Sequence, residues 1–296
     1  MANVENEADT FQEVYEFQDL SDEYHRFERD IDRVENLEDG VSIVRRFYNS
    51  QTLKSECWYY EGDIHRGENL PAVIRYNKEG GLVEHIWYQN GMKYRDGDLP
   101  ALVHYYNEQI SWEYWYQNGK LHRDGDLPAV IEYENGEISS EYWHQNDENH
   151  RDGDLPAIID YDENGNIIQE QWYQNGELHR DGDLPVLIEY HENGTVSLKN
   201  WYQNEDLHRD GDLPAVIKYD KNGNIIQEEW YQNDELHRDE DLPAHIEYNE
   251  HGSVIRKEWY QNGKLHRDNE YAAIIEYNEN GGIIRKEWWR YGIHCS

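Results

Sequence analysis

The sequence predicts an all-β protein in which antiparallel β-hairpins form one elongated, twisted, solenoid-like sheet behind a short N-terminal helical cap. The first observation is a repeat, because tryptophan recurs every 28 or 29 residues along most of the 296-residue chain. A repeat of this length is typical of arrays in which each unit buries its core against its neighbours. The repeated tryptophans are Trp58, Trp87, Trp115, Trp143, Trp172, Trp201, Trp230, Trp259 and Trp288.

The second observation is that each unit contains two turn signals and one proline. Asn118-Gly119 shows the first turn, after a Trp-Tyr pair, and Asn135-Gly136 shows the second. Asn-Gly tolerates positive φ and therefore favours tight hairpin turns. All seven prolines of the chain occupy one repeat position, in five units just after an Asp-Gly-Asp group, which predicts a bulge or loop there. These prolines are Pro71, Pro100, Pro128, Pro156, Pro185, Pro214 and Pro243.

The alternation of side chains predicts which residues share a face of the sheet. Ala129, Ile131 and Tyr133 have the same parity, so we expect them on one face. The tyrosine of this position recurs as Tyr161, Tyr190 and Tyr219. The position five residues before each Trp is always apolar, as at Ile138. The Trp has the opposite parity, so it shares that face only if a bulge intervenes, and the sequence leaves both arrangements open.

The chain divides into an acidic segment, residues 1–40, and a repeat domain, residues 41–296. The segment holds 14 acidic and three basic residues, and its apolar residues from Phe11 to Leu37 recur every three or four positions. This period predicts an amphipathic helical cap over the first strand, with docking to a partner as the alternative. Within the repeat domain, residues 41–57 form a half-unit, residues 58–287 form eight units, and the degenerate residues 288–296 form a C-terminal cap.

The unit resembles the MORN repeat, whose pattern is W-x-N-G-x-x-H-G-x-G followed by Y-x-x-G. The matching residues in one unit are Trp172, Asn175, Gly176, His179, Tyr190 and Gly194. The long unit is most similar to MORN-like proteins of large DNA viruses of amoebae, and a related pattern occurs in YwqK-type antitoxins. The resemblance covers residues 41–296 and implies hairpin arrays used in protein contacts, oligomerisation or membrane association. The chain departs from it where Arg-Asp-Gly-Asp-Leu-Pro replaces the compact H-G-x-G.

Composition restricts the class of partner. The formal net charge of −36 repels nucleic acids and anionic lipids, so we expect a basic or self-associating protein partner, no nucleic acid and no lipid binding. Cys57 and Cys295 lie at opposite ends of the array, as free thiols of a reducing compartment would. No signal peptide and no apolar run of membrane-spanning length is present, so we expect a cytoplasmic location, either host cytoplasm or virion if the protein is viral.

Two repeated residue types are candidates for chemistry. One histidine per unit, such as His150, forms a row along the array, whereas a zinc site needs three or four converging ligands. The Asp-Gly-Asp groups lack the spacing of a calcium loop, and a preceding Arg supplies a nearer counter-charge, so turn chemistry is favoured over calcium binding. We therefore expect neither metal nor cofactor. The aspartates form a candidate acidic interaction surface: Asp96, Asp98, Asp124, Asp126, Asp152, Asp154, Asp181, Asp183, Asp210 and Asp212.

The sequence contains no nucleophile motif, phosphate loop or zinc-protease motif, so we expect no enzyme. The first functional hypothesis is a non-enzymatic scaffold that mediates protein–protein interaction or structural assembly through its extended repeated surface. The alternatives are an acidic, DNA-mimic-like decoy that inhibits a basic host protein, and an antitoxin-like binder. A continuous row of carboxylates on one edge or groove would favour the decoy.

Overall fold

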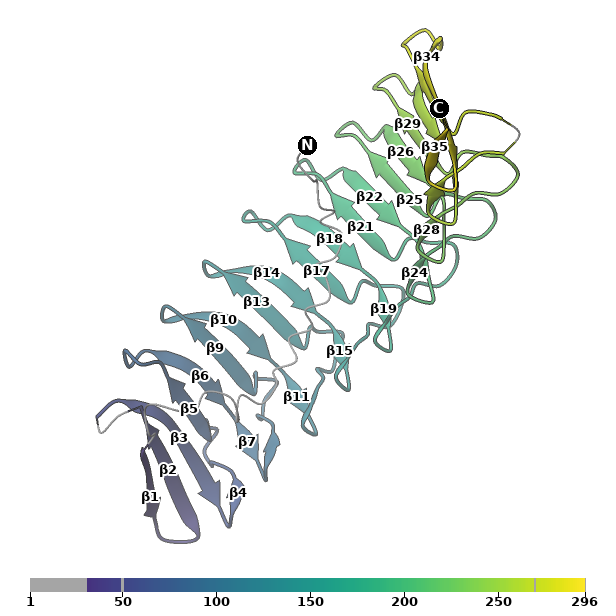
Figure 1. Ribbon diagram of the computed structural model, residues 1–296. Helices are drawn as coiled ribbons and strands as arrows, with labels where there is room; N and C mark the ends of the chain where they lie inside the picture. Colours follow the sequence, from purple (N-terminus) through teal and green to yellow (C-terminus); the bar gives the residue numbers. More distant parts are fainter. Residues whose placement is uncertain (1–30, 49–50, 269, 296) are drawn as a thin grey trace.

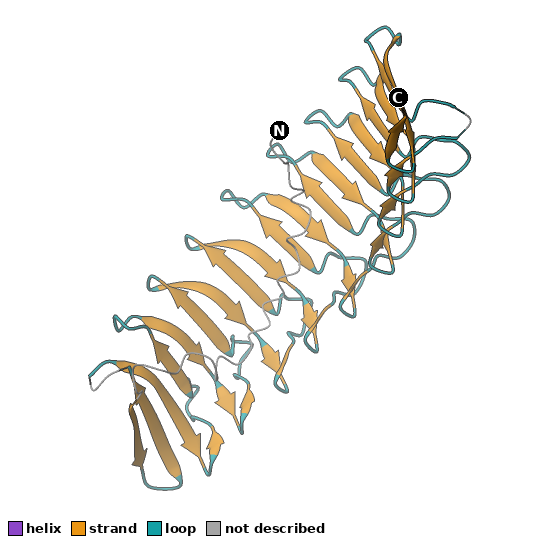
Figure 2. Ribbon diagram, viewed as in Figure 1, coloured by secondary structure: helices purple, strands orange, loops and turns teal. Residues whose placement is uncertain are grey.

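The computed structural model describes residues 31–48, 51–268 and 270–295, and in them the protein is an all-β array without a helix. The long strands lie side by side in one elongated, twisted sheet, and short hairpins form a second row along it (Figures 1 and 2). The described residues accordingly include no helix that could cross a membrane.

Each repeat contributes two long strands to the main sheet. The strands are β1 (Ile31–Asn36), β2 (Val41–Phe47), β3 (Leu53–Tyr60), β5 (Val73–Tyr76), β6 (Leu82–Ile86), β9 (Leu102–Tyr106), β10 (Gln109–Tyr114), β13 (Val130–Glu134), β14 (Glu137–Tyr142), β17 (Ile158–Tyr161), β18 (Ile167–Gln171), β21 (Leu187–Tyr190), β22 (Val196–Asn200), β25 (Val216–Tyr219), β26 (Ile225–Glu229), β29 (His245–Tyr248), β30 (Val254–Glu258), β33 (Ile274–Tyr277) and β34 (Ile283–Arg290).

Each unit also contributes a short hairpin immediately after its Trp. The short strands are β4 (Asp63–Ile64), β7 (Tyr88–Gln89), β8 (Met92–Lys93), β11 (Tyr116–Gln117), β12 (Lys120–Leu121), β15 (His144–Gln145), β16 (Glu148–Asn149), β19 (Tyr173–Gln174), β20 (Glu177–Leu178), β23 (Tyr202–Gln203), β24 (Asp206–Leu207), β27 (Tyr231–Gln232), β28 (Glu235–Leu236), β31 (Tyr260–Gln261), β32 (Lys264–Leu265) and β35 (Ile293–Cys295).

A bulge in every unit settles the orientation of the tryptophan. In the pair β13–β14, Tyr133 faces Ile138 and Glu132 faces Ser140, so one extra residue lies between the two pairings. The extra residue reverses the alternation of the strand. Trp143 therefore packs on the same side as Ala157 and Ile159, against Tyr161. The expectation that the alanine, isoleucine and tyrosine share a face is confirmed, and the open question about Trp is decided in favour of the bulge.

The second turn of the unit has two forms, and the shorter one accounts for the two units in which the tryptophans are 28 and not 29 residues apart. Asn118 and Gly119 both have positive φ, 52° and 78°, as a two-residue type I′ turn requires. Asn135 and Gly136 have the same geometry, and their unit spans 28 residues from Trp115. In a 29-residue unit the second turn is one residue longer, and only Gly165 has positive φ. There Asp162 accepts the main-chain N–H groups of residues 164 and 166.

The core is a thin layer repeated along the array. Ala129, Ala157 and their equivalents are completely buried, because the small side chain lies directly beside the indole of a Trp. A tyrosine from the following short hairpin closes the layer, as Tyr173 does beside Trp143. The elongated array is therefore stabilised by contacts between successive units.

The helical prediction is wrong for the part of the acidic segment that the structure describes. Residues 31–36 form strand β1, which pairs antiparallel with β2, and residues 1–30 lie outside the described residues. The pairing allows Arg45 to bind Glu35 at 2.7 Å and Arg46 to bind Asp32 at 2.9 Å. Val34 stays exposed, so no apolar helix face is buried here. Strand pairing and these ion pairs outweigh a local helical period.

Candidate interaction site

An arginine covers the indole of each repeat tryptophan from Trp58 to Trp259, which excludes Trp112. The guanidinium carbon of Arg151, eight residues after Trp143, lies 3.8 Å from the centroid of the indole. Its Nη1 donates to the carbonyl oxygen of Pro156 at 3.2 Å, which fixes the arginine to the loop before the next long strand. We call this arrangement of a tryptophan and its arginine the joint. The joint combines cation–π attraction with exclusion of water from the indole.

The joint also connects each unit to the preceding one. Arg151 donates from Nε and Nη2 to the two carboxylate oxygens of Asp126, at 2.7 and 3.0 Å. Two parallel charge-assisted hydrogen bonds fix both distance and orientation. The hydrogen bond to Arg151 lowers the pKa of the Asp126 carboxyl. The same pairing occurs in six units of the described residues, where the aspartates are Asp98, Asp126, Asp154, Asp183, Asp212 and Asp241.

The main chain of the same aspartate receives the indole N–H. Trp143 Nε1 donates to the carbonyl oxygen of Asp126 at 3.3 Å, and Asp126 adopts positive φ, 55°, to present it. Trp230 makes the equivalent bond to Asp212 at 3.1 Å. Trp58 Nε1 donates instead to the Glu56 carboxylate, and Trp201 Nε1 is buried with no hydrogen-bond partner among the described residues. One aspartate therefore holds both the tryptophan and the arginine of the following unit.

The structure assigns the two aspartates of each Asp-Gly-Asp group to different environments. The second ones, such as Asp126, belong to the joint, and their arginine comes from the following unit and not from the preceding residue. The first ones pair with the histidine two residues earlier, as Asp152 does with His150 at 3.1 Å. Their side chains are 71–92% exposed from Asp124 to Asp268. The second set is 45–55% exposed and paired with arginine, so the first set forms the more accessible row of carboxylates.

Four of the repeated histidines in the described residues connect neighbouring units, whereas Nδ1 of His122 and of His208 has no hydrogen-bond partner there. The main-chain N–H of Asn175 donates to Nδ1 of His150 at 3.1 Å, so Nδ1 is an acceptor and the proton resides on Nε2, which donates to Asp152. The same bond from the next unit recurs at His65, His237 and His266. Among the described residues no three His, Cys, Asp or Glu side chains gather as a metal site would require.

The opposite face of the main sheet varies from unit to unit, except at the position two residues after each Pro, which is apolar in every unit but that of His245. We call it the inner face. It carries the residues one and three positions before each repeat Trp, such as Tyr142 and Ser140. These pair across the strands with the residues two and four positions after each Pro, such as Val130 and Glu132. The first two positions read Cys57, Ile86, Tyr114, Tyr142, Gln171, Asn200, Glu229, Glu258 and Glu287, and Ser55, Glu84, Trp112, Ser140, Gln169, Leu198, Gln227, Arg256 and Arg285. The joint, by contrast, repeats almost without change.

The inner face begins with apolar and aromatic side chains in its N-terminal half. Val73, Ile86 and Leu102 form a buried cluster with tyrosines from the short hairpins. Trp112 stacks near Tyr142, with ring centroids 6.1 Å apart. Val73, Ile86 and Leu102 are at most 7% exposed, so the apolar side chains that remain half-buried on this part of the face are the aromatic ones, Trp112, Tyr114 and Tyr142.

The middle of the inner face is acidic. Glu132, Asp160 and Glu189 occupy the same position in three successive units, and burial raises the pKa of each carboxyl. Ser140 Oγ donates to Asp160 at 2.7 Å, and no Lys or Arg of the described residues forms an ion pair with any of the three. Further along, His245 contacts Glu229 and Glu247, each at 3.0 Å. The inner face therefore changes from apolar to acidic to mixed charge along the array.

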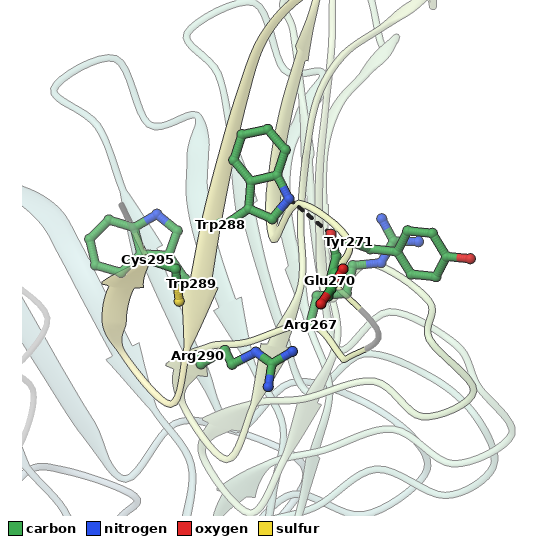
Figure 3. Close-up of a pocket in the computed structure, with 7 residues that line it drawn as sticks. All are labelled: Arg267, Glu270, Tyr271, Trp288, Trp289, Arg290 and Cys295. Atoms are coloured by element: carbon green, nitrogen blue, oxygen red, sulfur yellow. Dashed lines mark hydrogen bonds between the residues drawn. The ribbon is translucent and has the colours of Figure 1, made fainter.

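A hollow of about 420 Å³ lies beside the last tryptophan (Figure 3). Trp288 Nε1 donates to the carbonyl oxygen of Glu270 at 2.9 Å, as Trp259 Nε1 does to that of Asp241. Trp288 is 42% exposed, whereas Trp259 is 6% exposed. The residues that line the hollow are Arg267, Glu270, Tyr271, Trp288, Trp289, Arg290 and Cys295.

The fold and these surfaces define the chain as an all-β tandem-repeat protein. A comparison with protein-family models finds no match, and a search among curated proteins finds none either. The resemblance to MORN repeats therefore stays a prediction. The sequence interpretation missed the inner face and the hollow. Aligning the units would have revealed the inner face as the positions that vary, and Ser296 as the residue at the arginine position after Trp288.

Proposed function

We propose that the protein is a non-enzymatic scaffold that binds a protein partner through the inner face. The observation that supports this proposal is the contrast between the repeated joint and the varying inner face. If the inner-face residues only stabilised the sheet, the same residues could occupy these positions in every unit. An interface that recognises an extended partner needs a different side chain at each step, arranged as apolar anchors and polar contacts.

The proposed interface has a direction along the array. Its N-terminal half, around the half-buried Trp112, Tyr114 and Tyr142, fits apolar side chains of a partner. Its middle, from Glu132 to Glu189, fits cationic side chains, which would restore the ionised state of carboxylates whose pKa burial has raised. A partner that carries an apolar stretch followed by a basic one satisfies both parts.

The test is affinity purification with mass spectrometry from the native host, with wild-type protein and two triple variants. The inner-face variant is Glu132→Gln, Asp160→Asn and Glu189→Gln. Its matched control neutralises Glu163, Glu192 and Glu250, which are exposed in the turns. Partners that the control retains and the inner-face variant loses support the proposal. Partners retained equally by both variants contradict it.

The acidic decoy is the second candidate, and the row of first aspartates supports it. Asp124, Asp152 and Asp181 occupy equivalent, highly exposed positions in successive units. Binding of a histone or a basic nuclease would be measured at increasing salt. Binding that persists unchanged at about 0.5 M salt contradicts an electrostatic decoy, because such contacts are screened at that ionic strength. Loss of binding in the triple variant Asp124→Asn, Asp152→Asn and Asp181→Asn, with binding retained by the inner-face variant, would favour the decoy over the inner face.

A further inference from the structure

The joint is an intramolecular binding site for a guanidinium group, and the chain contains eight filled examples. In each, an arginine lies over an indole with its guanidinium carbon 3.8–4.0 Å from the centroid. In six, a carboxylate of the preceding unit binds the same guanidinium through two hydrogen bonds. The recognition elements are thus one aromatic face and one carboxylate held at a fixed distance.

The same elements recur at Trp288. Its indole N–H bonds to the carbonyl of Glu270 at 2.9 Å, as that of Trp259 bonds to Asp241 at the same distance, and both acceptor residues precede their Trp by 18 positions. Glu270 also shares the positive φ of Asp241, 61° against 55°. The backbone that positions a joint carboxylate is therefore reproduced, with glutamate in place of aspartate.

The arginine of this ninth joint is missing from the sequence. Ser296 stands eight residues after Trp288, where the eight other tryptophans have an arginine. Among the described residues no cation lies over the Trp288 ring, and no ion pair engages the Glu270 carboxylate. The indole is exposed toward the hollow shown in Figure 3, which has room for a side chain at about 420 Å³.

We propose that Trp288 and Glu270 form a binding site for an arginine side chain of a partner polypeptide. The planar guanidinium stacks on the indole while its N–H groups donate to the carboxylate, as the internal arginines do. Lysine has neither the flat face nor the paired donors, so it binds more weakly. The net charge of −36 adds a general attraction for cations. This site is separate from the inner face and does not depend on its proposed function.

Two arginines of the chain also line the hollow and enter the design of the test. Arg267 is engaged in its own joint with Trp259 and Asp241. Arg290 forms no ion pair with another described residue, so its charge opposes an incoming guanidinium or its side chain competes for the ring. The Arg290→Gln variant removes both effects, and the site should bind arginine more tightly in that variant.

The experiment uses ¹⁹F NMR of the full chain labelled with 5-fluorotryptophan. The resonance of Trp288 is assigned by its loss in Trp288→Phe. The probes are arginine, lysine and citrulline, each blocked as the N-acetyl methylamide; citrulline keeps the shape of arginine without its charge. We expect blocked arginine to shift the Trp288 resonance, in wild type and more strongly in Arg290→Gln, while citrulline leaves it unchanged.

Two further variants test the assignment. Glu270→Gln should weaken binding of blocked arginine about threefold to fivefold, the factor of an exposed ion pair, whereas Glu279→Gln should have no effect. Ser296→Arg supplies the missing arginine in the same chain and should shift the Trp288 resonance and abolish its response to the probe. The proposal is overturned if blocked arginine does not shift the Trp288 resonance in either wild type or Arg290→Gln. It is also overturned if blocked citrulline shifts the resonance equally, or if Glu270→Gln binds blocked arginine with unaltered affinity.

Discussion

The guanidinium carbon of Arg151 lies 3.8 Å from the centroid of the Trp143 indole, while the same guanidinium binds Asp126 in the preceding unit. The tryptophan, which dominates the sequence pattern, is thus buried by a charged side chain. The arginine contributes its apolar stem and flat face to packing and its N–H groups to the connection between units.

We predict that Arg151→Lys destabilises the array by about 1–3 kcal/mol, because lysine cannot form the two parallel bonds to Asp126 or stack on Trp143. Urea unfolding followed by tryptophan fluorescence measures the effect. Arg290→Lys, at an exposed arginine that forms no ion pair with another described residue, is the control, and we expect a smaller change there. An equal change in both variants would contradict the role of the joint.

The indole hydrogen bond can be isolated by comparing two tryptophans. Trp230 donates to Asp212, whereas Trp201 has no acceptor among the described residues. Both Trp→Phe variants lose similar packing, but only Trp230→Phe loses a hydrogen bond. We expect it to be about 1 kcal/mol more destabilising than Trp201→Phe, the typical net value of such a bond. Equal losses in thermal or urea unfolding would show that the bond contributes nothing.

Neutralising Asp126 and neutralising Asp160 should change the stability of the protein in opposite directions. The hydrogen bond from Arg151 lowers the pKa of Asp126, so its stabilisation is present above the unfolded pKa and is lost as the pH falls through the folded pKa. Burial raises the pKa of Asp160, so its ionisation opposes folding as the pH rises through the folded pKa. At neutral pH, Asp126→Asn should destabilise and Asp160→Asn should stabilise. Unfolding midpoints measured at neutral pH, and again well below the unfolded pKa, test both signs.

His144 occupies the position that most units give to tyrosine, and burial lowers its pKa to about 4. The unfolded chain binds a proton near the ordinary value of 6.5, so this histidine reduces stability as the pH falls from there toward about 4. His144→Tyr should remove that component, which appears as a flatter difference curve of unfolding midpoint against pH. His251→Tyr, at an exposed turn, is the control. Parallel curves for wild type and His144→Tyr would contradict the prediction.

The repeat, the turns and the shared face of Ala129, Ile131 and Tyr133 were predictable, because they depend on spacing and local backbone preference. The side of Trp143 was not, since it depends on a bulge that shifts the pairing of Tyr133 and Ile138. The helical cap predicted for residues 1–40 is wrong at residues 31–36, because the pairing of β1 with β2 is a contact between segments that a local period does not reveal.

The candidate acidic surface was predictable only as a set of residues. Nothing in an Asp-Gly-Asp sequence separates Asp124, which is exposed beside His122, from Asp126, which binds Arg151 of the following unit. That distinction depends on side chains 25 residues apart meeting across the boundary between units. Whether the exposed aspartates bind a partner stays a prediction.

Because Asp126 serves Arg151 and Asp154 serves Arg180 through the same geometry, neighbouring units are interchangeable at their boundaries. A whole unit can be duplicated or deleted in the gene without any compensating substitution elsewhere. The length of the proposed interface can therefore change in steps of one unit, while its half-buried inner-face residues change by single substitutions. Under the proposed function, the size of the contact and its chemistry would thus evolve independently.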